Sequence, residues 1–148
     1  MTLRSLAGAL VLALVASPVF AQQTAPAGRI KIASGAAFIV RDGKPLPAKA
    51  GVDVMEADTL RTGPDGRLGV TLKDDTRVSL GPASEIRLDR FTYAPAESQF
   101  GLVLRLVQGV AAYVSGRIAK LSPDSIRLET PAAIVGVRGT TMLLRTGT

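Results

Sequence analysis

The 148-residue sequence contains no cysteine, no histidine and no tryptophan, and only four phenylalanines and two tyrosines. Without histidine or cysteine, the chain cannot assemble a Ser-His-Asp or Cys-His nucleophilic system. The same absence excludes an ordinary zinc or transition-metal site, because such sites depend on those ligands. A chain without cysteine has no disulfides, so its stability must come from packing. The few aromatic rings leave little on which nucleic-acid bases could stack.

Few catalytic groups remain, and their surroundings do not favour catalysis. Ser115 and Lys120 could form a serine–lysine dyad, but they lie in a loop-like segment without an oxyanion-hole motif nearby. Two carboxylates could support glycan hydrolysis, yet the acidic residues are expected in turns and on polar strand faces. These residues are Asp53, Glu56, Asp58, Asp65, Asp74, Asp75, Glu85 and Asp89. We therefore expect a protein with no enzymatic activity, no cofactor and no metal.

The N-terminus has the pattern of a cleavable signal peptide over residues 1–21. Arg4 provides a positive start, residues 6–15 form an apolar run, and the small residue Ala21 ends the segment. The run is shorter than the roughly 20 residues that a spanning helix needs, although an uncleaved N-terminal anchor is the alternative. Cleavage would leave a periplasmic protein without a transmembrane span, beginning with a disordered leader over residues 22–28 (QQTAPAG).

Basic residues outnumber acidic ones by 18 to 12, and removal of Arg4 leaves a net charge of +5. A basic surface can attract nucleic acid, anionic lipid or acidic polymer. Here the positive charges are scattered singly among hydrophobic residues, which favours a solvated surface of mixed charge. Together with the expected export, this pattern argues against nucleic acid as a partner.

Apolar residues alternate with polar ones in short runs throughout residues 29–148, which predicts half-buried strands in one all-β domain. The alternating positions are Ile30 and Ile32; Leu68, Val70 and Leu72; Val78 and Leu80; Ile86 and Leu88; Leu102, Leu104 and Leu106; Val110, Ala112 and Val114; and Ile126 and Leu128. Turn signals separate the runs: Asp42-Gly43, Pro64-Asp65-Gly66, Lys73 to Thr76, Gly81-Pro82 and Gln108-Gly109. At most one short helical turn is expected, within residues 116–125.

The spacing of the strands is regular, with one break in phase. Leu88 and Phe91 are out of phase, so we expect a bulge or corner between them. Strand starts near residues 68, 77, 86, 102, 110, 126 and 133 suit a sandwich, a barrel or the rungs of a solenoid.

The segment TPAAIVGVRGTT, residues 130–141, places Arg138 between glycines. A phosphate-binding loop needs a following helix N-terminus, whereas strand is expected on both sides here. A guanidinium in this position can bind main-chain carbonyls or a carboxylate. We therefore expect Arg138 to act as a structural clamp of the last strand, with main-chain carbonyls or the carboxylate of Glu129, Asp58 or Asp89 as its partner.

The spaced motifs resemble those of the FecR domain. The segments GVDVMEADTLRTGPDGRLGVTLKDDTRVSLGPASEIRL, LRLVQGVAAYVSG and ETPAAIVGVRGTT occur in the order of that family's pattern, and the resemblance covers about residues 51–144. Its boxes include Asp74-Asp75-Thr76 and Ser84-Glu85. The other motif residues, for which we expect a structural role, are Asp58, Arg61, Thr62, Gly63, Thr130, Pro131, Arg138, Gly139 and Thr140.

The resemblance implies a fold and a setting. It implies twisted, stacked β layers, so we expect a short solenoid-like form or a flattened sandwich. Family members resemble signal-transducing anti-sigma proteins with a membrane span before the domain. Only a signal peptide precedes the domain here, so we expect a stand-alone module that binds an envelope signalling or assembly protein through strand edges. The rival interpretation is a module that binds an envelope polymer, glycan or anionic lipid. The pattern specifies no oligomeric state.

Overall fold

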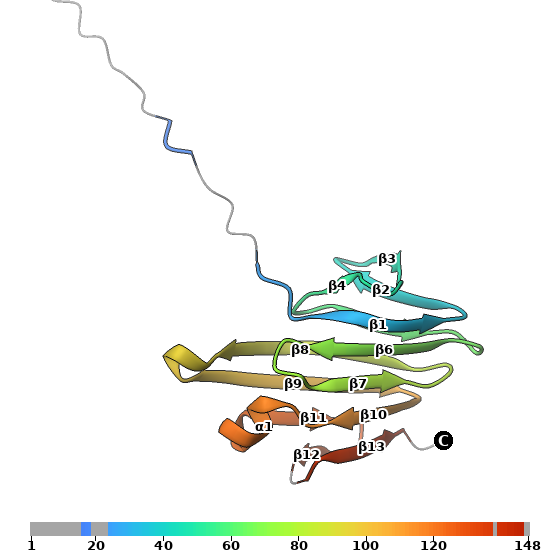
Figure 1. Ribbon diagram of the computed structural model, residues 1–148. Coiled ribbons are helices and arrows are strands. Elements are labelled where there is room, and N and C mark those ends of the chain that lie inside the picture. Colours follow the sequence, from blue (N-terminus) through green and yellow to red (C-terminus); the bar gives the residue numbers. More distant parts are fainter. Residues whose placement is uncertain (1–15, 19–23, 138, 147–148) are drawn as a thin grey trace, which may run out of the picture.

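Two open β-sheets lie face to face in the computed structural model, which describes residues 16–18, 24–137 and 139–146 (Figure 1). Sheet A contains, in spatial order, β13 (Thr141–Arg145), β10 (Val110–Val114), β7 (Arg77–Leu80), β6 (Arg67–Leu72), β1 (Gly28–Ser34) and β4 (Asp53–Val54). Sheet B contains β12 (Ile134–Gly136), β11 (Ile126–Glu129), β9 (Gln99–Gln108), β8 (Glu85–Ala94), β5 (Thr59–Thr62), β2 (Ala37–Arg41) and β3 (Lys44–Pro47). The all-β prediction is confirmed, and the two-sheet arrangement is that of a flattened sandwich.

A single hydrophobic core fills the space between the sheets. Alternate residues of most strands point into it, as the period-two pattern predicts, whereas β3 is exposed throughout. In β6 the buried side chains are Leu68 and Val70, while in β9 Leu102 and Leu106 are fully buried. In strands where only one set of alternate residues is apolar, that set forms the core face.

The prediction that Val110, Ala112 and Val114 face the core is wrong. Ala111 and Tyr113 are buried instead, because the register sets them beside the buried Leu80 and Val78 of β7.

The strands stack along the molecule nearly in chain order, which gives the fold its solenoid-like progression (Figure 1). The described pairings are antiparallel, except for that of β11 with β9. This parallel pair arises because the chain leaves sheet B after β9, forms β10 in sheet A, and returns to sheet B through a short helix. The β1–β4 region lies at one end of the stack, and β12 and β13 lie at the other.

The predicted phase break is present, but two others were missed. The β8–β9 register shifts between Leu88 and Arg90, which confirms the expected bulge. A second shift lies between Glu85 and Ile86 at the start of β8, and a third lies between Ile30 and Ile32 in β1. The prediction that these two side chains share a face is wrong, because the bulge leaves Ile30 buried and turns Ile32 outward to 65% exposure.

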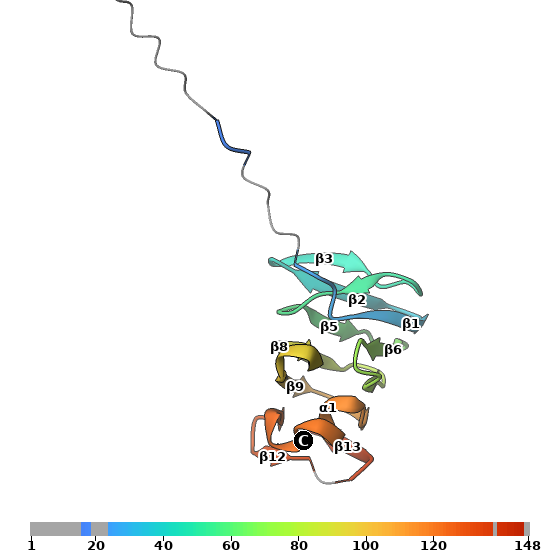
Figure 2. The same cartoon turned by 60° about the vertical axis from the view of Figure 1, so that its left-hand side comes forward.

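The helix α1 (Arg117–Leu121) is the one short helical turn that was expected, and it lies beside the lower strands in Figure 2. Two single 3-10 turns, η1 (Pro95–Glu97) and η2 (Pro123–Ser125), accompany it. Within the described ranges, no helix is long and apolar enough to cross a membrane.

The folded part begins slightly earlier than the leader prediction allows. Ala27 is buried, its N–H donates to the Val54 carbonyl at 2.8 Å, and its carbonyl accepts from the Lys73 N–H at 2.9 Å. Ala27 and Gly28 therefore belong to the domain, because both of their neighbours in sheet A hold them. The expected signal peptide and the new N-terminus at Gln22 lie mostly outside the described residues.

Candidate functional site

Five polar side chains are buried in the part of the chain that the structure describes. They are Asp58, Thr62, Asp74, Thr76 and Ser84. All five lie within the motif segment that the sequence singled out, and all lie at or beside turns. Buried polar groups need hydrogen-bond partners, so their partners show whether these residues are available to a ligand.

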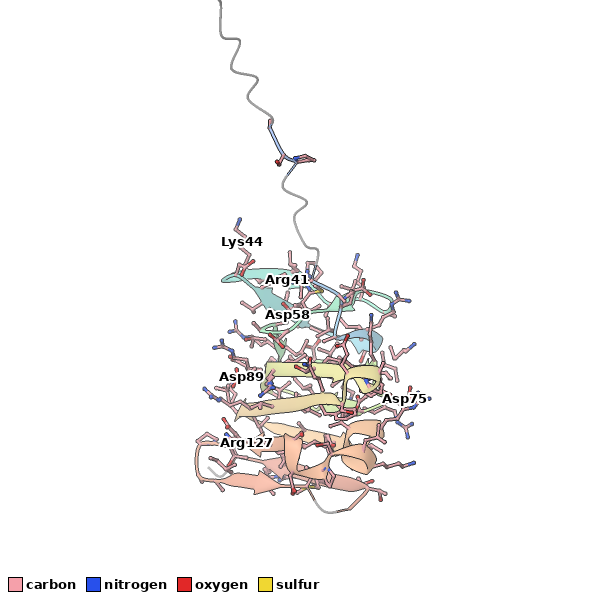
Figure 3. All side chains as sticks on the ribbon, turned by 90° about the vertical axis from the view of Figure 1, so that its left-hand side faces the viewer. Arg41, Lys44, Asp58, Asp75, Asp89 and Arg127 are labelled. Carbon is pink, nitrogen blue, oxygen red and sulfur yellow. The ribbon has the colours of Figure 1, made fainter. Side chains whose placement is uncertain are left out.

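Asp58 precedes β5 and is bound from two directions. Its carboxylate accepts from Arg41 Nε at 2.9 Å, from Arg41 Nη2 at 2.8 Å and from the Met55 N–H at 2.8 Å. Arg41 Nη2 also donates to the Asp53 carbonyl at 3.2 Å. The hydrogen bond to Asp58 raises the pKa of Arg41. Figure 3 shows this pair near the β3 end of the stack. The Asp58 side chain is 1% exposed, and it follows directly on the turn before β5.

Thr62 and Ser84 join three turns on the other side of the core. The Thr62 hydroxyl donates to the Gly81 carbonyl at 2.7 Å and accepts from the Ser84 N–H at 3.0 Å. The Ser84 hydroxyl in turn accepts from the Val110 N–H at 2.9 Å. A side chain at Gly109 would collide with Ser84, since a Cβ there would lie 2.2 Å from the hydroxyl oxygen. These hydrogen bonds occupy both hydroxyl groups, so neither is free to bind a ligand.

Asp74 holds the β6–β7 turn against α1. Its carboxylate accepts from the Thr76 N–H at 3.1 Å, the Thr76 hydroxyl at 2.7 Å and the Ile118 N–H at 3.2 Å. The Asp74 carbonyl accepts from the Arg117 N–H at 2.7 Å. A Cβ at Gly116 would lie 2.3 Å from the Thr76 nitrogen, so only glycine fits this approach. Asp74 lies in the turn that the sequence predicted, and its buried carboxylate caps the start of α1.

Tyr113 is the exception among the buried polar groups. It is 1% exposed, and its hydroxyl has no hydrogen-bond partner among the residues described. Burial raises the pKa of this phenol. The alternation put Val110, Ala112 and Val114 on the core face of β10, so Tyr113 was expected on the opposite face, and no signal in the sequence pointed to its burial.

The remaining motif residues lie on the surface or in turns. Gly63 donates its N–H to the Ala36 carbonyl at 2.8 Å. Thr130 and Pro131 form the β11–β12 turn, in which the Thr130 N–H donates to the Ala133 carbonyl at 2.8 Å. These contacts are main-chain hydrogen bonds, and the structural role of the motif residues stays a prediction.

The segment before β13 is tied to the end of β10. The carbonyls of Gly139 and Thr140 accept from the Ser115 hydroxyl and N–H at 2.7 and 2.8 Å. Arg138 lies outside the described residues, so its clamp role stays a prediction.

The outer face of sheet B carries a ladder of ion pairs. Arg61 pairs with Glu85 at 3.3 Å. Arg87 and Arg105 both pair with Asp89, at 2.8 and 3.1 Å, and Arg105 also reaches Glu129 at 3.2 Å. Asp58, Asp89 and Glu129, the proposed partners of Arg138, thus all pair with other arginines. Figure 3 shows Asp89 and Arg127 on this side of the stack, and Asp75 on the opposite side.

The outer face of sheet A is different, because three of its arginines have no carboxylate partner among the described residues. Arg67, Arg77 and Arg145 point outward from β6, β7 and β13, and they form no ion pair with described residues. On this face, Arg29 pairs with Asp53 at 3.2 Å. The net positive charge is therefore concentrated on sheet A.

The sheet edges at the β1–β4 end are blunted. The two-residue turn Asp42-Gly43 makes Arg41 and Lys44 a hydrogen-bonded pair, and such pairs alternate along a hairpin. Pro45 and Pro47 therefore occupy the β3 positions whose main chain faces away from β2, and proline has no N–H to offer. In sheet A, the edge strand β4 is two residues long. Neither edge suits an added strand.

The edges at the opposite end are open. β12 and β13 are the last strands of their sheets, and both contain main-chain N–H groups. Each also exposes a large apolar side chain, Ile134 and Leu143, both 68% exposed. A surface hollow of about 460 Å³ lies alongside β12, lined in part by Ile126, Arg127 and Val135. This end of the stack is the candidate functional site, and strand alternation alone did not reveal it.

The described residues show no cluster suited to other chemistry. No group of three acidic side chains that could hold a metal ion occurs among them. The polar atoms buried in the core serve turns, apart from the Tyr113 hydroxyl. What the geometry defines is a β-sandwich domain with one blunted end and one open end.

The family comparison agrees with the motif pattern. The family model described as FecR protein matches residues 58–148, more than half of the chain. The chain belongs to the FecR family. No curated protein and no solved structure gave a significant match. The strands β1 to β4 precede the matched range, yet they complete both sheets.

Proposed function

We propose that this chain is a non-enzymatic, periplasmic binding module that takes up a strand from an envelope protein at its open end. The observation that carries the proposal is the contrast between the two ends of the sandwich. Proline and a two-residue strand close one end, whereas β12 and β13 offer main-chain donors and acceptors at the other. Strand addition uses such groups for affinity and neighbouring side chains for specificity.

The lack of enzymatic function is proposed on chemical grounds. The sequence contains no histidine or cysteine, and the buried carboxylates Asp58 and Asp74 are occupied by hydrogen bonds. A general acid or base needs access to substrate and a free position for the proton. Membership of the FecR family supports a role in envelope signalling.

Site-specific photo-crosslinking in cells tests the proposal. A photoreactive amino acid is placed at Leu143 or Ile134, with matched controls at Leu46 on the blunted β3 edge and at Leu121 on α1. Leu46 and Leu121 are also exposed, at 39% and 57%. We expect a discrete adduct with another envelope protein from the first two positions alone. Adducts from the controls instead, or from none of the four positions, would refute binding at the open end.

Localisation is tested separately by the mass of protein from a periplasmic extract. We expect a chain that starts at Gln22, because the apolar run and Ala21 fit signal-peptide cleavage. A mass that retains residues 1–21 would contradict this part of the proposal.

The unpaired arginines of sheet A favour a second candidate function, binding of an anionic envelope polymer or lipid surface. Arg67 and Arg77 lie on neighbouring strands of this face, without carboxylates to neutralise them. Vesicles containing phosphatidylglycerol and a soluble polyuronate distinguish a lipid from a glycan. The double variant Arg67→Gln/Arg77→Gln should abolish such binding, and added salt should weaken it. The control Arg87→Gln, from the neutralised face of sheet B, should bind normally.

A further inference from the structure

The main-chain directions along β13 follow from the bonds at its two ends. The Ser115 N–H donates to the Thr140 carbonyl at 2.8 Å, and the Thr146 N–H donates to the Gly109 carbonyl at 3.0 Å. Because hydrogen-bonded and non-bonded positions alternate in an antiparallel pair, the main chain of Met142 and Leu144 faces β10. The main-chain groups of Thr141, Leu143 and Arg145 therefore face outward, away from the sheet.

The same reasoning applies to β12. Thr130 and Ala133 form a bonded pair at the turn, with distances of 2.8 and 3.4 Å. The next bonded pair joins Leu128 to Val135, so the main chain of Ile134 and Gly136 points away from β11. On each open edge, the residues whose main-chain groups face outward are placed symmetrically about one central residue. That residue is Leu143 in β13 and Val135 in β12.

We propose that a second copy of this chain occupies the open end, with β13 paired antiparallel to β13 and β12 to β12 about a two-fold axis. The inference rests on the proposed function, because it uses the same strand-accepting edges, and it names their occupant in the free protein. Such a contact is isologous, in that each copy contributes the same surface. A heterologous partner strand would then compete with the second copy.

The side chains are complementary to themselves across this axis. In β13, Leu143 meets Leu143 of the second copy, and Thr141 lies opposite Arg145, so no two like charges face each other. In β12, the exposed Ile134 lies opposite Gly136 of the second copy, where a Cβ would meet nothing within 4 Å. The two Leu143 side chains therefore lie side by side on the outer face of sheet A, and Ile134 meets a position without a side chain, so neither contact forces bulky groups to collide.

The blunted ends explain why such an assembly stops at two copies. Pairing through β12 and β13 leaves only the β3 and β4 edges at both ends of the dimer. Pro45 and Pro47 remove the outward N–H groups there, and β4 is too short to template a strand. The two prolines and the short β4 therefore also prevent the dimer from adding further copies and growing into a fibre.

Analytical ultracentrifugation of the purified chain tests the inference. We expect twice the chain mass for the wild type and for the control Ile32→Lys, which changes an exposed residue in the interior of sheet A. Leu143→Lys should sediment as a monomer, because it sets two positive charges opposite each other. Circular dichroism of all three proteins checks that the variants stay folded.

A cysteine scan gives a positional test, because the chain has no cysteine of its own. Leu143→Cys should form an intermolecular disulfide on mild oxidation, since directly paired strand residues have Cα atoms within the roughly 4.4–6.8 Å that a disulfide spans. Ile32→Cys should not. A monomeric wild type, or equal cross-linking of both variants, would overturn the dimer. If the chain is monomeric but Leu143 still cross-links to an envelope protein in cells, only the self-pairing fails; if that adduct is also missing, the proposed function fails with it.

Discussion

At the scale of single residues, the domain uses its buried polar groups to fix turns. Asp58 and Asp74 each accept three hydrogen bonds, and each joins segments that are distant in the sequence. A carboxylate in this position stabilises the fold only while all of its partners remain, because an unsatisfied buried donor costs free energy. Substitutions at these positions should therefore affect folding before they affect binding.

Replacing Asp58 by alanine should lower the free energy of unfolding by about 1.5 to 3 kcal/mol, the range for hydrogen bonds to a charged group. The Met55 N–H and the Arg41 guanidinium lose their acceptor, and only the guanidinium can turn to solvent. Urea denaturation measures the loss. The matched control is Asp75→Asn, which removes the charge of a 65% exposed carboxylate, keeps a residue type that tolerates the positive φ of 69° at this position, and should cost far less. Equal stability of the two variants would contradict the turn-clamp interpretation.

Replacing Tyr113 by phenylalanine, unlike replacing Asp58, should not lower the free energy of unfolding. The hydroxyl is buried without a partner among the described residues, so its removal should leave stability unchanged or raise it by up to about 1 kcal/mol. The raised pKa of Tyr113 means that the folded state favours the neutral phenol. The free energy of unfolding therefore does not change with this group below the unfolded pKa of about 10, and it decreases as the pH rises above that value.

Denaturation of both proteins between neutral and alkaline pH separates the two effects. The wild type should lose more stability than Tyr113→Phe above the unfolded pKa of tyrosine, because only the wild type must keep this phenol protonated. A variant that is clearly less stable at neutral pH would show that the hydroxyl has a partner after all.

At the scale of elements, the edge strands decide what the sandwich can bind. Pro45 and Pro47 are placed at alternate positions of β3, and this spacing matches the period of outward-facing main-chain groups. Leu46 between them faces β2 with its main chain. The two prolines thus act as one device that closes an edge.

Converting both prolines to threonine should open this end of sheet B. We expect the double variant Pro45→Thr/Pro47→Thr to form species larger than the wild type. Each threonine supplies an outward-facing N–H group that proline lacks, and threonine also favours strands. Light scattering over a concentration series measures this. Leu46→Thr serves as the control and should behave like the wild type. If the double variant keeps the wild-type mass, the prolines do not protect the edge.

Sequence patterns predicted the strands well and the edges poorly. The period-two runs matched the buried faces of β6, β7, β9 and β11, and the phase break after Leu88 located a bulge. The face of β10 was predicted wrongly, because both alternating sets of residues in this strand are apolar and Ala111 and Tyr113 are the buried ones. The bulge beside Ile32 was missed, because two isoleucines at strand spacing look like one face whether or not a residue is inserted. Open edges depend on the spatial order of strands, which no local pattern encodes.

The same limit applies to the buried polar residues. Their type and spacing pointed to turns, and the turns are there. Arg41 was missed as the partner of Asp58, because the pairing joins residues 17 positions apart, and β3 and β4 lie between them in the chain. Such a pairing depends on the register of β2 against β5, so it can be identified only when the arrangement of the sheet is known.

At the scale of the whole molecule, the folded unit is larger than the segment that matches the family. Residues 28–54 supply β1 to β4, and Ile30, Ile39 and Val54 from these strands are completely buried. β1 lies between β4 and β6, while β2 covers the edge of β5. Removing these strands would expose the core of both sheets at once.

A chain that begins at Asp58 should therefore fail to fold cooperatively, whereas one that begins at Thr24 should unfold in a single transition. The reason is the loss of core area in a small domain that already buries only about two-thirds of its unfolded surface. Thermal unfolding followed by circular dichroism compares the two. A sharp transition in the shorter chain would show that the family-matched segment is sufficient by itself.

The direction of the strands has a mechanical consequence. They run across the long axis of the stack, and the described chain enters near β1 and leaves at β13, at opposite ends (Figure 1). Tension applied between Thr24 and Thr146 would load the hydrogen bonds of one strand pair after another, instead of shearing many at the same moment. The domain should then yield at low force in successive small steps, so that a taut connection in the cell envelope would lengthen gradually at this point before anything stiffer gave way.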